Sequence, residues 1–157
     1  MAIGNMTSLP QIAFISAIAF NFCLLGTDAH AKNYSLLIGP AQVRLAPLYD
    51  VASFHPSVET ASGRLDDLRM PMRIGDRRRY SEIEPRHVER LMQEIGFPAE
   101  DAMIIFHDMA RQLPRQAAEL RDDIRGGPCD HAMLDDVQRA LTDWCRRITE
   151  RWWGEAS

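Results

Sequence analysis

A strongly apolar stretch from Ile12 to Leu25, which stops at a polar segment, is the feature that most constrains the fold of this chain. Its apolar side chains recur at three- and four-residue steps, the spacing of one face of an α-helix: Ile12, Ile15, Ala19, Phe22 and Cys23. Ser8 can cap this helix, and Pro10 suits its first turn. The sequence therefore predicts a buried helix that ends near Leu25.

Two other interpretations of this stretch are a secretory signal and a membrane span. The small residues Ala29 and Ala31 that follow it are typical of a signal cleavage site. However, a signal needs a positive amino-terminal region, and no Lys or Arg precedes Lys32, while Asn21 interrupts the apolar run. The run is also too short to cross a bilayer. We therefore expect a core helix and no membrane contact.

The composition indicates one compact domain over residues 1–157, because 46% of the residues are apolar and can form a core. A net charge of -4 and a pI near 5.7 argue against direct nucleic-acid binding. The cysteines Cys23, Cys129 and Cys145 are odd in number and form no C-x-x-C pair. They predict neither a disulfide framework nor a zinc site, and they favour a reducing cytoplasm.

The middle of the chain contains strand signals. Tyr34–Ile38 and Val43–Ala46 are short β-prone runs joined by a segment with Gly and Pro, which predicts a hairpin. Pro47 ends the second run, and Ser53–Gly63 is rich in small and polar residues, as expected of a mobile surface loop. The charge run Arg77–Arg79 is interpreted as a solvated turn rather than a binding site.

The carboxy-terminal half is predicted to be helical. One helix opens at Glu84-Pro85, a second opens at Pro98-Ala99 and closes at Gly126–Pro128, and the last starts near Asp130. A single stripe of the last helix carries large apolar side chains, which we expect in the core: Leu134, Val137, Leu141, Trp144, Ile148 and Trp152. The predicted fold is mainly α, with a short β-hairpin and a helical scaffold.

The polar segment after the first helix carries a possible catalytic constellation. Phosphoryl transfer requires a base near the acceptor hydroxyl and oxygen ligands for Mg²⁺, which protein kinases supply with an Asp, an Asn five positions later and a downstream Asp. Asp28, Asn33 and Asp50 have this spacing. One amide and one carboxylate suffice for Mg²⁺, which retains water and phosphate oxygens. Taken alone, the pattern also fits ordinary loop and capping residues, so both interpretations remain open.

The amino-acid sequence around these residues is a more specific signal than their spacing. The segments Phe20-Asn21, Thr27–Leu36 and Leu45–Val51 together resemble the HipA family of bacterial kinases. The resemblance continues more weakly through Leu68–Gly75, which is similar to the strand after the loop in that family. The chain departs from the family pattern at Gly26, where members usually have Asn.

The resemblance implies the helical carboxy-terminal lobe of a HipA/protein-kinase-like fold and a serine/threonine kinase that uses ATP and Mg²⁺. By motif, Asp28 resembles the catalytic base, Asn33 and Asp50 resemble the Mg²⁺ ligands, and Lys32 is placed to neutralise charge on the transferred phosphate. His30 has no partner histidine at ligand spacing and is interpreted as a loop-bracing residue.

The same resemblance implies partners. Family members are toxins of type II toxin-antitoxin systems, so it implies a HipB-like antitoxin and a protein substrate such as an aminoacyl-tRNA synthetase. Kinases hold ATP with a Gly-rich loop and a strand lysine that precede the catalytic loop, and neither precedes Asp28 here. We therefore expect a separately supplied N-terminal lobe, an exposed apolar patch on the first helix and hairpin, and little activity without that lobe. The alternative is a non-catalytic remnant or binding module that contacts an antitoxin or target protein.

Overall fold

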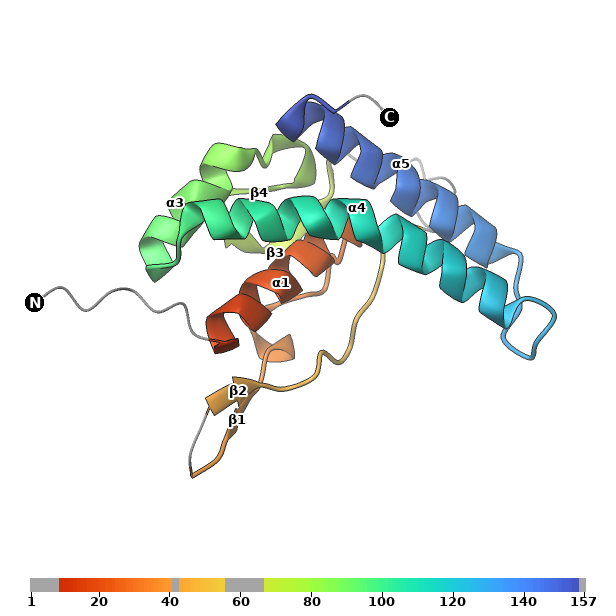
Figure 1. Cartoon of the computed structure of the whole chain (residues 1–157), viewed down its shortest axis with the longest axis horizontal. Coiled ribbons are helices and arrows are strands. Elements are labelled where there is room, and N and C mark those ends of the chain that lie inside the picture. The colour runs from red at the N-terminus through yellow and green to blue at the C-terminus, as the bar shows by residue number, and fades with distance from the viewer. Residues whose placement is uncertain (1–8, 41–42, 56–66, 156–157) are drawn as a thin grey trace, which may run out of the picture.

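A computed structural model of the chain describes residues 9–40, 43–55 and 67–155. Two long helices, α4 (Ala99–Ile124) and α5 (Met133–Trp153), lie side by side and antiparallel, and α1 (Leu9–Cys23) packs against them (Figure 1). The shorter α3 (Pro85–Ile95) packs on the amino-terminal part of α4. The mainly helical fold expected from the sequence is thereby confirmed.

Two small antiparallel hairpins accompany the helices. The first pairs β1 (Leu36–Ile38) with β2 (Val43–Leu45), and the second pairs β3 (Arg69–Ile74) with β4 (Arg77–Arg79). The β1–β2 hairpin was predicted from the sequence and forms in the register Leu36↔Leu45 and Ile38↔Val43. Figure 1 shows that it projects away from the helices, below α1.

The core is organised around the carboxy-terminal end of α1. Phe22 is fully buried, and its ring lies 5.6 Å from those of Tyr80 and Trp144 and 5.9 Å from that of Phe106, between ring centroids. Trp144 Nε1 also donates a hydrogen bond to the Phe22 carbonyl oxygen at 3.1 Å. Residues distant in sequence therefore fix the point at which α1 ends.

The end of α1 differs from the prediction. The helix ends at Cys23 rather than near Leu25, because Leu25 takes a left-handed conformation with φ 52° and Gly26 N–H donates back to the Asn21 carbonyl at 2.8 Å. Ile12, expected on the buried face, is partly exposed. The predicted cap Ser8 lies outside the described residues.

The prediction of a turn at Arg77–Arg79 is wrong, because these arginines form β4. The turn falls at Gly75-Asp76, where Gly75 has φ 58° and a Cβ atom would lie 2.7 Å from the His87 carbonyl oxygen. Glycine is the residue that tolerates both conditions. Arg77 and Arg78 are exposed, as expected of a solvated segment, and β3 matches the strand anticipated over Leu68–Gly75.

The predicted mobile loop Ser53–Gly63 falls mostly outside the described residues, since 56–66 are not described. At its start the prediction is wrong. His55 is 2% exposed, and Ser53, Phe54 and His55 all hydrogen-bond to the end of α1. These bonds hold the segment against the core, which a count of small and polar residues could not reveal.

The carboxy-terminal helices follow the sequence signals closely. α3 begins at Pro85 with Glu84 N–H donating to His87 Nδ1 at 2.9 Å, and α4 begins after Pro98 and ends before Gly126. α5 begins at Met133 rather than near Asp130, whose carboxylate instead accepts from Gly126 N–H at 2.7 Å.

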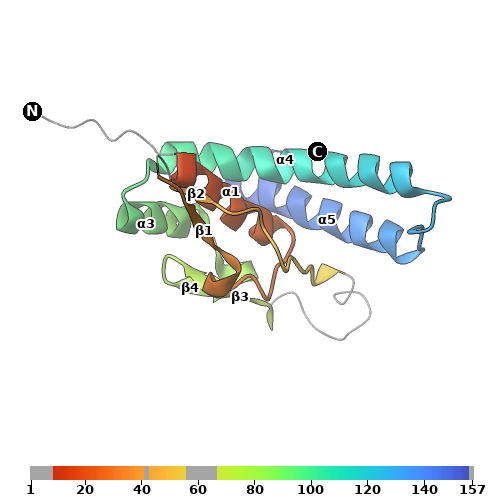
Figure 2. The same ribbon diagram turned by 90° about the horizontal axis from the view of Figure 1, so that it is seen from below.

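The predicted apolar stripe of α5 is buried in its central part. Leu141, Trp144 and Ile148 are buried, while Leu134 and Val137 are half-buried. The reason is visible in Figure 2, where the end of the α4–α5 pair nearest the connection between them extends past the rest of the described chain. Among the described helices, none has the length and hydrophobicity that crossing a bilayer requires.

Candidate active site

The four predicted site residues lie on two short segments that follow α1 and β2. Asp28 and Lys32 occupy the loop after α1, Asn33 closes its single 3₁₀ turn (Ala31–Asn33), and Asp50 follows β2. Backbone hydrogen bonds shape the loop: Ala29 N–H donates to Gly26 O at 3.3 Å, His30 N–H to Asp28 O at 2.7 Å and Asn33 N–H to His30 O at 2.9 Å. The loop is therefore ordered without belonging to a long helix or strand.

The Asn33 side chain joins these segments. It is 6% exposed, and its Nδ2 donates to the carbonyl oxygens of Asp28 at 3.3 Å and of Asp50 at 3.4 Å. An amide has two N–H hydrogens and one oxygen, so both donors are used by the protein and Oδ1 is left to accept. The structure thus brings Asp28, Asn33 and Asp50 together although they are 5 and 17 positions apart.

Asp50 has an uncommon backbone conformation, with φ 55°. A non-glycine residue in the left-handed region costs about 1 kcal/mol or more, and such residues cluster at functional sites. The preceding Tyr49 holds this turn against the loop, since its hydroxyl donates to the Lys32 carbonyl at 2.6 Å and pairs with Ser35 Oγ at 2.9 Å. The carboxylates of Asp28 and Asp50 lie on exposed residues, so an external ligand can reach them.

The chemistry of this donor set fits Mg²⁺ better than a softer metal. Among residues 9–40, 43–55 and 67–155, no group of three or more His, Cys, Asp and Glu side chains could hold a metal ion. Asp50 and Asn33 offer one carboxylate and one amide oxygen, hard ligands that suit Mg²⁺ when water and phosphate oxygens complete its shell. A cavity of about 10 Å³ beside Asn33 and Asp50 is too small for more than one water.

Lys32 stands out from the other cations of the chain. It is exposed at the 3₁₀ turn, and it is the single lysine among the 18 basic residues of the sequence, the other 17 being arginine. Lysine presents a compact ammonium and arginine a broad planar fork, so the two are not equivalent against a phosphoryl group. Because every other basic residue is arginine, the use of lysine at this position is consistent with its predicted role beside a phosphoryl group.

His30 lies beside the predicted base, with its Nε2 4.0 Å from Asp28 Oδ1. Its Nδ1 is buried and has no hydrogen-bond partner among the described residues. Its loop-bracing role stays a prediction.

Sequence reasoning missed the part played by Asn21. Its Nδ2 donates to Ala17 O at 2.9 Å and to the Tyr34 hydroxyl at 3.0 Å, which links α1 to the end of the loop. Its Oδ1 would lie 2.8 Å from a Cβ atom at position 26, so Gly26 leaves room for it. In this chain Gly26 and Asn21 therefore fit together sterically, and a buried polar residue inside the apolar run was the available signal.

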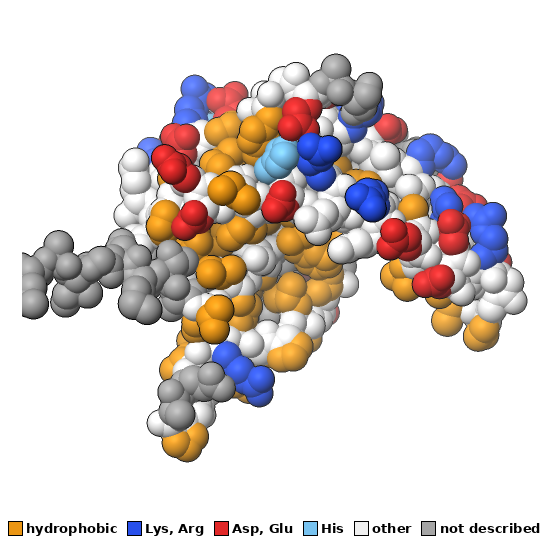
Figure 3. All heavy atoms as spheres, viewed as in Figure 1, with side chains coloured by type: hydrophobic (Ala, Val, Ile, Leu, Met, Phe, Trp, Pro, Cys, Tyr) orange, Lys and Arg blue, Asp and Glu red, His pale blue; other side chains and the backbone are white. Residues whose placement is uncertain are grey.

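An apolar hollow of about 540 Å³ opens between α1, the loop, the β1–β2 hairpin and β3. It is lined mainly by hydrophobic side chains: Pro10, Gln11, Phe14, Ala31, Tyr34, Leu36, Leu45, Met72 and Ile95. Leu37, Ile38 and Val43 of the hairpin are also exposed, and Figure 3 shows hydrophobic side chains over α1 and the hairpin. The apolar surface expected on the first helix and hairpin is present.

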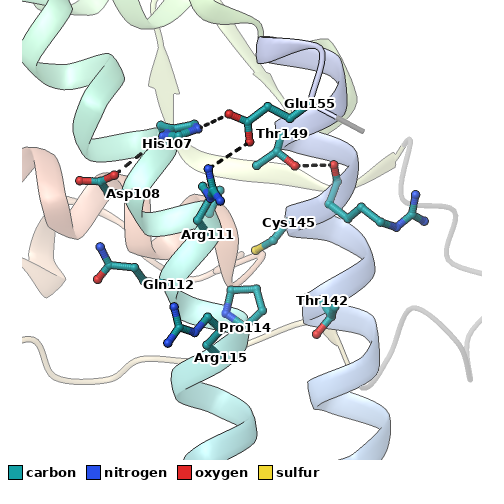
Figure 4. A pocket seen from close by; sticks show the side chains of 12 residues that line it. His107, Asp108, Arg111, Gln112, Pro114, Arg115, Thr142, Cys145, Thr149 and Glu155 are labelled. Atoms are coloured by element: carbon teal, nitrogen blue, oxygen red, sulfur yellow. Dashed lines mark hydrogen bonds and ion pairs between the residues drawn. The ribbon is translucent and has the colours of Figure 1, made fainter. Parts of the chain in front are cut away.

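Another hollow, of about 450 Å³, lies between α4 and α5 and contains none of the four predicted site residues (Figure 4). Three of its charged groups pair with one another, since Glu155 lies 2.8 Å from His107 Nε2 and 3.6 Å from Arg111 Nη1. Because none of the predicted site residues lines this hollow, we do not assign the active site there.

A loop of this geometry, a hairpin and a helical scaffold define the helical lobe of a protein-kinase-like fold. Residues 5–117 match the model of the HipA-like C-terminal domain, and the chain belongs to that family. The resemblance noted from the sequence is thereby confirmed. At the level of the family, the context is that of kinases and toxin-antitoxin systems.

Two relatives illustrate the match. The chain is 30% identical over 87 residues to the protein named "Putative kinase Y4mE" of Sinorhizobium fredii (strain NBRC 101917 / NGR234), covering 54% of this chain and 19% of that protein. A chain in the solved toxin-antitoxin complex of HipA, HipB and operator DNA from Shewanella oneidensis MR-1 superposes with a TM-score of 0.72 at 21% identity. At this low sequence identity the likeness is one of fold. The match covers 92% of this chain and 32% of the other, and this chain spans less than a third of the length of either relative.

Proposed function

We propose that this chain is the catalytic-loop lobe of a HipA-like serine/threonine protein kinase, the toxin of a type II toxin-antitoxin system. The observation that carries the proposal is the Asn33 amide, which donates to the carbonyls of both Asp28 and Asp50 and so gathers the three residues at one site. The family model, which covers the whole of this region, supports it.

In the proposed reaction the chain's residues position groups and move one proton. The serine Oγ of the protein substrate forms a bond to the γ-phosphorus of ATP, the bond to the β–γ bridging oxygen breaks, and ADP leaves. Asp28 accepts the hydroxyl proton, and Lys32 neutralises charge on the transferred group. Asn33 Oδ1 and the Asp50 carboxylate would hold Mg²⁺, which when bound neutralises charge on the phosphate oxygens.

We further propose that an ATP-binding lobe, in the same polypeptide or encoded separately, packs on the apolar hollow beside α1. The hollow is lined chiefly by hydrophobic side chains next to the catalytic loop, and such a surface is costly to leave in water. Without that lobe we expect little kinase activity. A HipB-like antitoxin, an aminoacyl-tRNA synthetase substrate and a cytoplasmic location, where ATP is abundant, complete the proposal.

Transfer of labelled phosphate from ATP tests the proposal. The chain would be assayed alone and together with the nucleotide-binding segment of a longer homologue, with the Asp28→Ala variant as the matched control. We expect transfer when both parts are present and a loss of at least about 100-fold with Asp28→Ala. No labelling by the complemented wild-type chain would overturn the catalytic assignment.

A second candidate function is a binding module that contacts an antitoxin or target protein without catalysis. The exposed apolar hollow favours it, because that surface can bind a protein regardless of chemistry. The Asp28→Ala variant separates the two functions. If the chain is part of a kinase, Asp28→Ala abolishes phosphate transfer and leaves partner binding intact. If the chain is a binding module, wild type and Asp28→Ala both bind the partner and neither transfers phosphate.

A further inference from the structure

The carbonyl oxygens at the end of α1 receive hydrogen bonds from a segment that follows Asp50. The last carbonyls of a helix have no donor within the helix and need partners from elsewhere. Cys23 O bonds to His55 Nε2 at 3.0 Å, Leu24 O accepts from Ser53 Oγ at 2.8 Å, and Leu25 O accepts from Phe54 N–H at 3.3 Å. We call the three residues Ser53–His55 the α1 clamp.

Both segments of the predicted active site, the loop that carries Asp28 and the segment that carries Asp50, connect to this clamp. The clamped carbonyls end three residues before Asp28, and the clamp itself begins three residues after Asp50. The clamp is therefore a second connection between the two segments, independent of the Asn33 side chain. Its inner end is buried, since His55 is 2% exposed, and His55 N–H also donates to Ser53 Oγ at 3.3 Å.

The Asn33 bonds are longer than two of the three clamp bonds. The bonds from Asn33 to Asp28 O and Asp50 O are 3.3 and 3.4 Å long, beyond the usual 2.7–3.2 Å for N–H···O bonds, as is the 3.3 Å clamp bond from Phe54 N–H, whereas the clamp bonds from Ser53 Oγ and His55 Nε2 are 2.8 and 3.0 Å. The clamp also holds Leu25, which is buried in a left-handed conformation with φ 52° that costs about 1 kcal/mol or more. Strain of this kind persists where the surroundings hold the residue in place.

We propose that Ser53 and His55 are positioning residues, which set the distance between the Asp28 loop and Asp50 through the end of α1. This inference rests on the proposed kinase function, since it concerns the same site. Displacement of catalytic groups by about 1 Å can reduce a rate about 100-fold. Loss of the clamp therefore affects the rate of transfer more than it affects the affinity for ATP.

The first test uses hydrogen exchange of the whole chain. The amides of Ala29, His30 and Asn33 report on the loop, and the buried part of α4 reports on global stability. Ser53→Ala and His55→Leu should raise loop exchange about 10-fold more than α4 exchange, the ratio that corresponds to about 1.4 kcal/mol. The variants Ser53→Thr and His55→Gln, which keep a donor, should restore protection.

A control variant, Thr149→Val, removes the hydrogen bond that the hydroxyl of the buried Thr149 donates to Arg146 O within α5, and it should leave the loop-to-α4 ratio unchanged. Equal acceleration of loop and α4 in the clamp variants would reduce the clamp to ordinary stabilisation and overturn the proposal. Should His55→Leu not fold, Ser53→Ala decides the question, because it deletes a single oxygen atom.

The second test uses phosphate transfer in the presence of the ATP-binding lobe. We expect Ser53→Ala to lower kcat at least about 10-fold with KM for ATP within about twofold of wild type, and Ser53→Thr to recover most of the rate. An active wild type whose kcat is unchanged by Ser53→Ala contradicts the positioning role. An inactive wild type instead overturns the proposed function, and the exchange experiment then still decides on the clamp.

Discussion

Asn33 and Asp28 occupy one site but differ in what their substitution should do. Asn33→Ala removes both hydrogen bonds of a buried amide and leaves two carbonyls without that donor, so we expect a loss of about 1–3 kcal/mol in the free energy of unfolding. Asp28→Asn changes an exposed side chain and should stay within about 0.5 kcal/mol. Urea denaturation of the two variants measures the difference, and equal stability of both would contradict the linking role of Asn33.

The burial of His55 predicts a pH dependence of stability. Desolvation lowers the pKa of His55 in the folded protein, although its hydrogen bond to the Cys23 carbonyl opposes this shift. The unfolded chain, with an ordinary histidine pKa of about 6.5, then binds the proton more readily than the fold. The contribution is fully present above the unfolded pKa and is lost as pH falls through the lower, folded value.

This dependence can be isolated by comparing wild type with His55→Gln in urea titrations from pH 8 to pH 5. The other histidines, His30, His87, His107 and His131, are present in both proteins, so the difference between the two curves belongs to His55. We expect wild type to lose stability relative to His55→Gln as the solution is acidified. A constant difference across the range would contradict the lowered pKa.

The candidate site residues were predicted from local sequence. Asp28, Lys32, Asn33 and Asp50 follow from their spacing and from the residues around them, and the structure brings three of them together through the Asn33 bonds, while their catalytic roles stay a prediction. Tyr49 and His55 were not found, because they act through hydrogen bonds to backbone carbonyls. Such contacts depend on the path of the chain, which residue type and spacing do not determine.

At the level of elements, the junction between α1 and the loop depends on a steric fit between Gly26 and Asn21. A Cβ atom at position 26 would lie 2.8 Å from Asn21 Oδ1, so Gly26→Ala must displace that side chain and weaken its bond to Tyr34. We expect Gly26→Ala to destabilise the chain by about 1–3 kcal/mol, as overpacking typically does.

A double-mutant cycle checks this explanation. In an Asn21→Ala background the clashing oxygen is absent, so the cost of Gly26→Ala should fall below about 0.5 kcal/mol and the two substitutions should be non-additive. Thermal or urea unfolding supplies the four stabilities required. Additive effects would show that Gly26 is needed for a reason other than the room it leaves for Asn21.

Element boundaries were predictable where the chain signals them locally. The starts of α3 and α4 follow from the prolines and acidic residues at 84–85 and 98–101, and these positions need no tertiary information. The end of α1 and the strand β4 were misjudged because tertiary contacts decide them. The clamp bonds hold Leu25 out of the helix, and the close approach of His87 to Gly75 sets the turn ahead of the arginines.

For the whole molecule, the distribution of apolar surface is as informative as the core. The described helices bury a continuous set of side chains from α1, α3, α4 and α5, yet the β1–β2 hairpin keeps all three residues of β1 exposed. The mainly helical class followed from the sequence, because helical periodicity and caps are local. The depth and lining of the hollow beside α1 did not, since they require knowledge of how the hairpin and β3 meet that helix.

This surface gives a prediction about association with the proposed ATP-binding lobe. Ile38 is 82% exposed on the hairpin, so Ile38→Glu should change the stability of the isolated chain by no more than about 0.5 kcal/mol. If the lobe packs there, the variant must bury a charge and should bind it at least about 10-fold more weakly. The matched control is Leu120→Glu, a substitution of a 62% exposed side chain on α4, which should bind as wild type does.

Calorimetric titration of the three chains with the lobe gives the affinities. Equal weakening by both substitutions would indicate a nonspecific effect of charge, and no weakening by Ile38→Glu would exclude packing of the lobe on this part of the hairpin, because a glutamate cannot be buried against apolar side chains without a partner.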